Sequence, residues 1–311
     1  MKSSREYFNA AGMKMSRPRL SILAPFYKDD PVPLVLALCD QIEAASDCVE
    51  IVLFDDGEPD PALNRTVERT LSQLNFPACL VTSGRNVGRA AARNRLAMAA
   101  RGEWLLYLDA DMDVPQAFID TYIAAMDHAG FDAVFGGYEP GPAHDPRHRL
   151  HAALAATSDV HDAASRTRIG ATAVCSSNLL VRRSLMEAVP FDDSFTGWGW
   201  EDVDWAVRAD QQGVLSHLDN PARHDGWQDV STLLSKYRDA ATNYARLLDK
   251  HPQLARLPGA KAANWLRRIP GQSLLRGLWA SMARARLFPM RARTLALKLW
   301  RASWAAEALH S

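Results

Sequence analysis

Cysteine, net charge and long apolar runs are all scarce in this chain of 311 residues. Its four cysteines include no Cys-x-x-Cys pair, which fits reduced thiols in a cytosolic protein better than a disulfide framework or a zinc site. The 36 Lys and Arg residues balance 36 Asp and Glu residues, so the chain as a whole lacks the basic excess of a nucleic-acid-binding protein. No run of about 18 apolar residues occurs, which predicts that no helix crosses a membrane. The N-terminus also lacks the apolar core of a secretory signal.

The balanced charge conceals a strong asymmetry along the chain. Residues 251–311 contain eleven Lys and Arg residues but only one acidic residue, Glu307. The preceding 250 residues carry the matching acidic excess. Two parts with such different charge predict separate units within a globular protein, since 48% of the residues are hydrophobic.

Short apolar runs alternate with helical patterns over the first 110 residues. The runs cover residues 20–25, 49–54, 79–81 and 104–108. Each predicts a buried strand, and the segments between them predict helices, among them an alanine-rich one over residues 90–100. This alternation predicts an α/β fold with a largely parallel sheet flanked by helices. Ligands of such sheets bind outside the carboxyl ends of the strands.

Acidic residues follow three of the predicted strands at that edge. Asp29 and Asp30 come after the first run, Asp55 and Asp56 after the second, and an Asp109-Ala110-Asp111 triplet after the fourth. Residues i and i+2 of a strand point the same way, so the two carboxylates of the triplet converge. They repel each other unless a cation lies between them or one of them is protonated. A hard divalent cation with oxygen ligands resolves that repulsion. The alternative is a solvated acidic turn in which Asp113 caps the next helix.

A second cluster joins aromatic rings to carboxylates in the segment Gly197-Trp198-Gly199-Trp200-Glu201-Asp202. Tryptophan faces are platforms for the apolar faces of sugars, and the glycines let the backbone turn tightly beside the rings. The alternative assigns the rings to a core and the acids to the start of a helix, where they favour its dipole. His224 follows another predicted strand. It is either an ordinary surface or core histidine or a nitrogen ligand added to the aspartates.

Five segments taken in order resemble the family 2 glycosyltransferases, which have the GT-A fold. They cover residues 19–228 and consist of the strand ending in Pro25-Phe26-Tyr27, the run Val52-Leu53-Phe54-Asp55-Asp56-Gly57, the run Asn86-Val87-Gly88-Arg89-Ala90-Ala91-Ala92-Arg93-Asn94, the triplet Asp109-Ala110-Asp111, and the Gly197–Asp202 segment. The last is similar to the Gly-Trp-Gly-x-Glu-Asp motif of galactosyl- and N-acetylgalactosaminyl-transferring members. Five motifs at sensible spacing are far more specific than any one alone.

The resemblance implies a donor site and a metal site. Pro25, Tyr27 and Asp55 would hold the nucleotide base, usually uracil. Asp109 would lie near the ribose, and Arg93 would line the donor site. Asp111 and His224 would ligate the metal, for which carboxylate, imidazole and phosphate ligands suit Mn²⁺ or Mg²⁺. Phe26, Lys28 and Glu58 stand where the family usually has other residues, so the base contacts differ in detail.

The resemblance also implies an inverting, metal-dependent transfer of a hexose or N-acetylhexosamine. The donor would be a nucleotide sugar with UDP as the expected nucleotide, and the acceptor a glycan or a lipid-linked molecule. Asp202 would accept the proton of the acceptor hydroxyl, Glu201 would bind an acceptor hydroxyl, and Trp198 would stack on the acceptor sugar. Two other functions remain as alternatives, a sugar nucleotidyltransferase-like enzyme and a non-catalytic membrane-associated scaffold. The first usually needs a glycine-rich phosphate loop after the first strand, which Pro25-Phe26-Tyr27-Lys28 does not supply.

The sequence therefore predicts an N-terminal tail over residues 1–18, a GT-A domain over 19–228, and a basic helical extension over 229–311. A long amphipathic helix is expected from Val230, and prolines divide the segment after it into short helices. Two expectations stay open for this extension. It lies on the anionic cytoplasmic face of a membrane as an interfacial amphipathic segment, or it packs on the acidic part of the protein or a second copy. Either places the protein in the cytoplasm.

Overall fold

The computed structural model describes residues 5–14, 17–43, 48–128, 130–158, 160–224 and 226–309, which fall into two units. The first unit comprises Met1–Gly141, His161–Ser194 and Trp205–Asp225. The second comprises Pro142–Val160, Phe195–Asp204 and Gly226–Ser311. The second unit thus contains two internal segments, Pro142–Val160 and Phe195–Asp204, in addition to the C-terminal extension. A single boundary at residue 228 would have placed both segments in the first unit.

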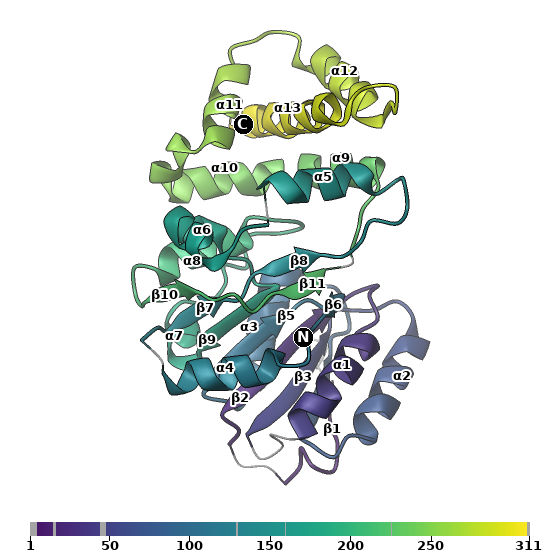
Figure 1. Cartoon of the computed structure of the whole chain (residues 1–311), viewed down its shortest axis with the longest axis vertical. Helices are drawn as coiled ribbons and strands as arrows, with labels where there is room; N and C mark the ends of the chain where they lie inside the picture. Colours follow the sequence, from purple (N-terminus) through teal and green to yellow (C-terminus); the bar gives the residue numbers. More distant parts are fainter. Residues whose placement is uncertain are drawn as a thin grey trace. The chain divides into compact units, whose positions relative to one another are not determined.

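The first unit is built on an eight-stranded sheet with the order β1-β4-β3-β2-β5-β9-β7-β10. Its strands are β1 (Arg5–Phe8), β2 (Leu20–Phe26), β3 (Val49–Asp55), β4 (Ala78–Thr82), β5 (Trp104–Leu108), β7 (Ala133–Phe135), β9 (Asn178–Arg182) and β10 (Leu215–His217). The four strands from β4 to β5 run parallel, whereas β1 and β9 are antiparallel to their neighbours. The predicted α/β fold with a mostly parallel sheet is confirmed (Figure 1).

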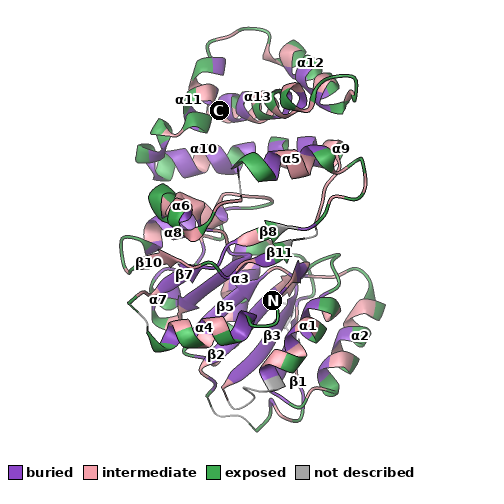
Figure 2. Ribbon diagram, viewed as in Figure 1, coloured by how far each residue is buried: buried purple, intermediate pink, exposed green. Residues whose placement is uncertain are grey.

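Helices cover both faces of this sheet, which explains why its central strands are apolar on both sides (Figure 2). Alternate residues of β2 and β3 enter two different cores. One core contains the helices α1 (Val32–Glu43), α2 (Pro61–Ser72) and α4 (Phe118–Asp127). The other contains α3 (Arg89–Ala99), α7 (Arg183–Ala188) and the residues Trp205, Ala206 and Ala209. The buried alanines of α3 let its backbone approach the sheet closely, as its composition predicts.

The N-terminal segment, expected to be a tail, contributes an edge strand. Residues Arg5–Phe8 pair antiparallel with β4. The buried side chain of Asn9 then donates to the carbonyls of Leu71 and Phe76 and accepts hydrogen bonds from the amides of Gly12 and Ala78. These bonds satisfy a buried polar side chain. Apart from Gly12, its partners lie more than 60 residues away, a relation that no local pattern reveals.

A small second sheet with the order β6-β11-β8 completes the first unit. Its strands are β6 (Met112–Asp113), β8 (Tyr138–Pro140) and β11 (Ala222–His224). Two short helices, α6 (Ala163–Ile169) and the 3-10 helix η1 (Gly170–Ala173), precede β9. Because β6 directly follows the Asp-Ala-Asp triplet, this sheet brings β11 beside it.

The second unit is helical. It contains α5 (Arg149–Ser158), α9 (Val230–Asp239), α10 (Ala241–Lys250), η2 (Pro252–Arg256), α11 (Pro258–Leu266), α12 (Gln272–Arg284) and α13 (Met290–Ala308), and the first turn of α8 (Glu201–Ala209). The amphipathic helix expected from Val230 is divided at Ala240. The breaks at Pro270 and Pro289 occur as predicted. Within the described residues, no helix is both long and apolar enough to cross a bilayer.

A buried carboxylate stabilises the amino edge of the sheet. Glu50 accepts hydrogen bonds from the hydroxyl of Ser21 at 2.7 Å and from the backbone amide of Arg101 at 2.6 Å. The guanidinium of Arg101 lies 2.7 Å from the same carboxylate. A buried charge needs such partners, since desolvation strongly disfavours an unpaired carboxylate.

We therefore expect Arg101→Met to lower the free energy of unfolding by about 3 kcal/mol, because it leaves the buried Glu50 carboxylate without its cationic partner. The exposed pair between Arg5 and Glu68 offers a matched control, and Arg5→Met should cost less than about 1 kcal/mol. Urea unfolding followed by circular dichroism measures both variants. Equal losses for the two would contradict this account of Glu50.

Candidate active site

The carboxyl ends of three parallel strands meet at one edge of the large sheet. Phe26, at the end of β2, is paired with Asp55 at the end of β3, and β5 ends alongside at Leu108. The segments that leave these strands begin with Tyr27, Asp56 and Asp109. The sheet topology thus places the segments that carry candidate residues for sugar-donor and metal binding at one edge. This is the edge at which α/β sheets bind ligands.

The carboxylate of Asp55 is buried and oriented by its own loop. It accepts hydrogen bonds from the amide of Glu58 at 2.6 Å and from the side chain of Asn64 at 2.7 Å. These two donors fix its direction at the end of β3. The predicted hydrogen bond from Asp55 to a nucleotide base stays a prediction.

Asp56 joins this loop to the start of α3, a role that the sequence analysis did not assign. Its carboxylate accepts hydrogen bonds from the amides of Val87 at 2.6 Å and Gly88 at 3.2 Å. Burial raises the pKa of Asp56, and the two amide hydrogen bonds oppose that rise. Gly57 adopts a φ of 78°, and a Cβ there would meet the backbone of Arg85 and Asn86 within 2.4 Å. The two motifs are therefore packed backbone against backbone.

The residues that depart from the family pattern near Tyr27 contact one another. Lys28 has a φ of 63°, a left-handed conformation that asparagine adopts more readily than lysine. Its amide donates to the carboxylate of Glu58, and its ammonium lies 5.0 Å from the ring centroid of Tyr27. Tyr27 itself is exposed, while Pro25 is half-buried in β2. The substitutions at 28 and 58 thus form one local arrangement rather than two separate changes.

Arg93 reaches the end of β5 from α3. Its buried guanidinium lies 3.1 Å from Asp109 and 5.8 Å from the ring centroid of Phe191. Tyr107 donates a hydrogen bond to the backbone carbonyl of Arg93 at 3.3 Å. In this arrangement Arg93 orients Asp109, and its predicted role in lining the donor site stays a prediction.

Strand pairing brings the backbone of His224 close to the acidic triplet. β11 runs antiparallel to β6 with His224 opposite Met112, the residue after Asp111. The side chain of His224 lies outside the described part of the chain. Asp113 pairs with Arg223 across the same two strands and does not cap α4, whose N-cap is Ala117.

The donor atoms at this edge suit a hard divalent cation. Asp109 and Asp111 are both partly exposed at the turn after β5, and carboxylate oxygens are ligands that suit Mn²⁺ or Mg²⁺. Among the described side chains, which exclude that of His224, no group of three His, Cys, Asp or Glu residues is arranged to hold a metal.

The Gly197–Asp202 segment belongs to the second unit and turns sharply before α8. Gly197, Gly199 and Trp200 have φ values of 80°, 86° and 77°. The side chain of Asn243 donates to the carbonyls of Thr196 at 2.9 Å and Gly199 at 3.0 Å, which fixes the turn. A bulky residue at positive φ is unusual, so this turn holds the Trp200 ring in a defined direction.

Both tryptophans of the segment contact aromatic rings of the helices that follow. The half-buried ring of Trp198 lies 5.8 Å from Tyr237, and that of Trp200 lies 4.5 Å from Tyr244. The guanidinium of Arg301 lies 4.7 Å from the Trp200 ring centroid. Sequence reasoning assigned a function to Trp198 only. Tyr237, Tyr244 and Arg301 could not be found, since they lie far along the chain from the two tryptophans.

Three carboxylates open α8, as the helix dipole favours. Glu201 is buried and Asp202 is partly exposed. Asp204 is fully buried and contacts the ammonium of Lys250 at 2.7 Å and the ring of His251 at 2.9 Å. Asp204 therefore has a structural role, whereas the acceptor-side roles of Glu201 and Asp202 stay predictions.

Comparison with known proteins identifies related sequences. The sequence model described as glycosyl transferase family 2 matches residues 21–189. A Mycobacterium tuberculosis protein named as a glycosyltransferase is 31% identical over 130 residues, which are 40% of this chain and 36% of that protein. An undecaprenyl-phosphate 4-deoxy-4-formamido-L-arabinose transferase of Pseudomonas fluorescens is 33% identical over 120 residues, 37% of this chain and 34% of that protein. The chain thus matches about a third of the length of these relatives.

Solved structures extend the similarity to the whole fold. The mannosyltransferase PcManGT of Pyrobaculum calidifontis, solved in complex with GDP-Man and Mn²⁺, superposes with a TM-score of 0.57. The superposition covers 95% of this chain and 88% of that one at 17% sequence identity. At this identity the likeness shows the fold alone, and that fold is GT-A.

Proposed function

The chain belongs to glycosyl transferase family 2, and we propose that it transfers a hexose or N-acetylhexosamine from a nucleotide sugar to a glycan or lipid-linked acceptor. The observation that carries this proposal is the gathering of Asp55, Asp109 and Asp111 at the carboxyl edge of the sheet, with the backbone of His224 paired next to the triplet. UDP is the nucleotide that the family resemblance favours, and GDP is the one bound by the Pyrobaculum mannosyltransferase.

On the donor side, Asp111 would bind Mn²⁺ or Mg²⁺ through its carboxylate, and His224 would be the nitrogen ligand. When bound, the cation supplies positive charge for the diphosphate leaving group. Asp109 faces the ribose in this proposal, and its ion pair with Arg93 holds the carboxylate in one direction. Asp55 would bind the base, and Pro25 and Tyr27 would flank it.

On the acceptor side, Asp202 accepts the proton of the attacking hydroxyl, so transfer occurs in one displacement with inversion. Its partial exposure at the first turn of α8 lets solvent or an acceptor reach it. Trp198 offers a half-buried ring on which a sugar can stack, and Glu201 binds an acceptor hydroxyl. No nucleophilic serine or cysteine is needed for this route.

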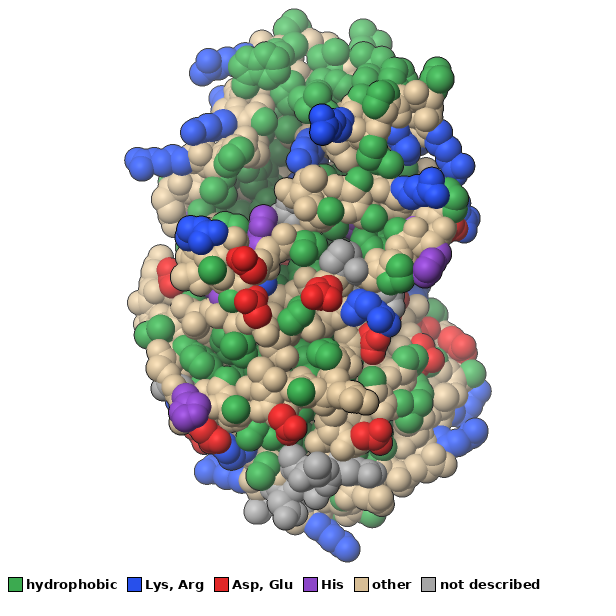
Figure 3. All heavy atoms as spheres, viewed as in Figure 1, with side chains coloured by type: hydrophobic (Ala, Val, Ile, Leu, Met, Phe, Trp, Pro, Cys, Tyr) green, Lys and Arg blue, Asp and Glu red, His purple; other side chains and the backbone are tan. Residues whose placement is uncertain are grey.

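The C-terminal helices favour a peripheral membrane location. Leu287 is 92% exposed and Leu274 is 81% exposed. Further exposed apolar residues in this region are Trp265, Leu278, Phe288 and Leu295. Exposed arginines that have no ion pair among the described residues accompany them: Arg267, Arg268, Arg284, Arg286 and Arg291. Figure 3 shows hydrophobic and basic side chains together over α11, α12 and α13. Such a surface suits anionic lipid.

The metal assignment predicts that Asp111→Ala abolishes turnover and metal-dependent donor binding, because the remaining ligands cannot hold a cation against the diphosphate. Hydrolysis of a panel of UDP- and GDP-sugars with Mn²⁺ or Mg²⁺ measures turnover, and calorimetry measures donor binding. Asp120→Ala, an exposed carboxylate on α4, is the matched control and should behave as the unaltered protein. Near-normal turnover of Asp111→Ala would assign this aspartate a structural role. A panel with no hydrolysed donor would refute the transferase proposal.

The base assignment predicts that Asp202→Asn lowers turnover by about 10²- to 10⁴-fold, since the amide cannot accept the acceptor's proton. Donor affinity should be retained, because this carboxylate serves the acceptor. The control is Asp210→Asn, which alters an exposed carboxylate just after α8. If Asp202→Asn loses donor affinity but turns over bound donor at the normal rate, then Asp202 binds the donor and is not the base for the acceptor.

The membrane proposal predicts co-sedimentation of the full chain with vesicles containing phosphatidylglycerol at low salt. Replacing Arg284, Arg286 and Arg291 with glutamine should reduce the bound fraction severalfold, since each cation contributes roughly 1 kcal/mol near an anionic surface. Arg65→Gln with Arg69→Gln, two exposed arginines of α2, provides the control. If the full chain stays in the supernatant, or if the control loses as much binding, the extension serves packing or assembly instead.

A further inference from the structure

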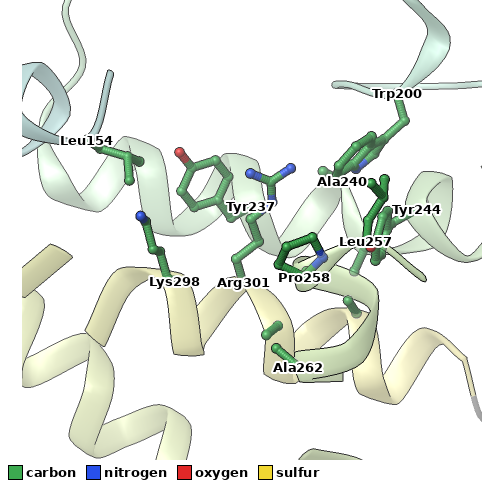
Figure 4. Close-up of a pocket in the computed structure, with 14 residues that line it drawn as sticks. Leu154, Trp200, Tyr237, Ala240, Tyr244, Leu257, Pro258, Ala262, Lys298 and Arg301 are labelled. Atoms are coloured by element: carbon green, nitrogen blue, oxygen red, sulfur yellow. The ribbon is translucent and has the colours of Figure 1, made fainter. Parts of the chain in front are cut away.

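A cavity of about 400 Å³ lies within the second unit. Its walls come from α5, the turn before α8, α9, α10, α11 and α13 (Figure 4). Apolar residues make most of the lining: Leu154, Ala240, Ala241, Leu257, Pro258, Gly259, Ala262, Ala302 and Ala305. Trp200, Tyr237 and Tyr244 add aromatic surface. A volume in this range and a largely apolar wall are typical of small-molecule sites.

Two cations enter this cavity from one face of α13. Lys298 and Arg301 are three residues apart, so they share that face, and both side chains extend from the helix toward α9 (Figure 4). The Arg301 guanidinium lies 4.7 Å from the ring centroid of Trp200 and 5.1 Å from that of Tyr237. Neither cation has a carboxylate partner among the described residues, and the lining includes no Asp or Glu.

The lining restricts the chemistry of a ligand. A free sugar needs several hydrogen-bond acceptors for its hydroxyl groups, yet no Asp, Glu, Asn or Gln side chain lines the cavity, and the hydroxyls of Tyr237 and Tyr244 are the only side-chain acceptors among the described lining residues. A neutral lipid would leave Arg301 and Lys298 desolvated without a counter-charge, which is costly. An apolar chain that ends in an anionic group satisfies both the walls and the cations.

We propose that this cavity binds a phosphate-bearing lipid chain, with the phosphate at Arg301 and Lys298 and the apolar chain against the alanine, leucine and proline wall. A planar guanidinium held between aromatic rings is pre-organised to bind a phosphate, so little side-chain entropy is lost on binding. The lysine adds a second, mobile point charge at the more exposed side.

The proposal adds to the transferase assignment and rests on it in one respect. Only if the chain is a transferase does the bound lipid carry the acceptor. Trp200 lines the cavity and is followed directly by Glu201 and Asp202, which we propose to bind and deprotonate the acceptor. A phosphate held at Arg301 would therefore anchor an acceptor whose reacting hydroxyl belongs near those carboxylates. A lipid-linked acceptor is the class that combines these features.

Binding of farnesyl phosphate to the full chain, below its critical micelle concentration, tests the cavity without any turnover. Isothermal calorimetry should give saturable binding with one site. Farnesol and inorganic phosphate should each bind at least about tenfold more weakly, since each lacks one half of the recognised chemistry. Vesicles of phosphatidylglycerol, added as a competitor, test whether a bulk lipid headgroup occupies the same site. They should not displace farnesyl phosphate if the cavity is specific for a carrier lipid.

Arg301→Gln should weaken farnesyl phosphate binding roughly ten- to hundredfold, the range expected for one charge-assisted contact. Lys298→Gln, at an exposed position, should weaken it severalfold, and Ala262→Phe should block the cavity. Arg65→Gln, an exposed arginine of α2 in the first unit, is the control and should leave binding unchanged.

Equal affinity for farnesol, displacement by the vesicles, or unchanged binding in both cation variants would overturn the proposal. So would the absence of any binding. Failure of the transferase assignment is a separate result, because nucleotide-sugar hydrolysis is measured on the same protein without lipid. Lipid binding without donor turnover would leave a lipid site in a protein of another activity, and donor turnover without lipid binding would refute the cavity alone.

Discussion

The hydrogen bonds from two backbone amides to Asp56 are the constraint on which the donor edge of the sheet depends. They join the end of β3 to the Val87–Gly88 turn, where α3 begins, and the contact at Gly57 excludes any side chain between the two loops. The position of α3 then determines where Arg93 emerges. Arg93 in turn orients Asp109. The hydrogen bonds of Asp56, after β3, therefore help to determine the position of the Asp109 carboxylate, after β5. Burial raises the pKa of Asp56, and the hydrogen bonds from the loop that it binds oppose that rise.

Much of the fold could be predicted because its central strands are local and apolar on both faces. The runs at 20–25, 49–54, 79–81 and 104–108 coincide with β2, β3, β4 and β5. The strand β1 could not be predicted, because Arg5–Phe8 is short and mixed in polarity and owes its structure to pairing with a strand some 70 residues away. The division between α9 and α10 likewise has no glycine or proline to mark it.

The candidate site divides in the same way. Asp55, Asp109 and Asp111 follow strands, so topology alone predicts that they share an edge. The supporting residues follow no such rule. Lys28 and Glu58 contact each other only because two loops meet. The two rings that Arg301 contacts come from two separate segments, the turn before α8 and α9. Long-range packing of this kind has no periodic signature in the chain.

The two expectations for the basic extension apply to different arginines. Arg276 pairs with Glu307, and Arg293 donates to the carbonyl of Ala283, so these two buried cations hold α12 and α13 together. The outward-facing arginines contribute nothing to that packing and remain available for an anionic surface. Arg301 belongs to neither group, because it is directed inward yet is met by aromatic rings rather than by a carboxylate. A cation stacked on Trp200 and Tyr237 retains its hydrogen-bonding capacity. Arg301 can therefore still donate hydrogen bonds to a ligand, unlike the arginines that pair within the helices. Its contact with Trp200 also joins α13 to the turn that precedes Asp202.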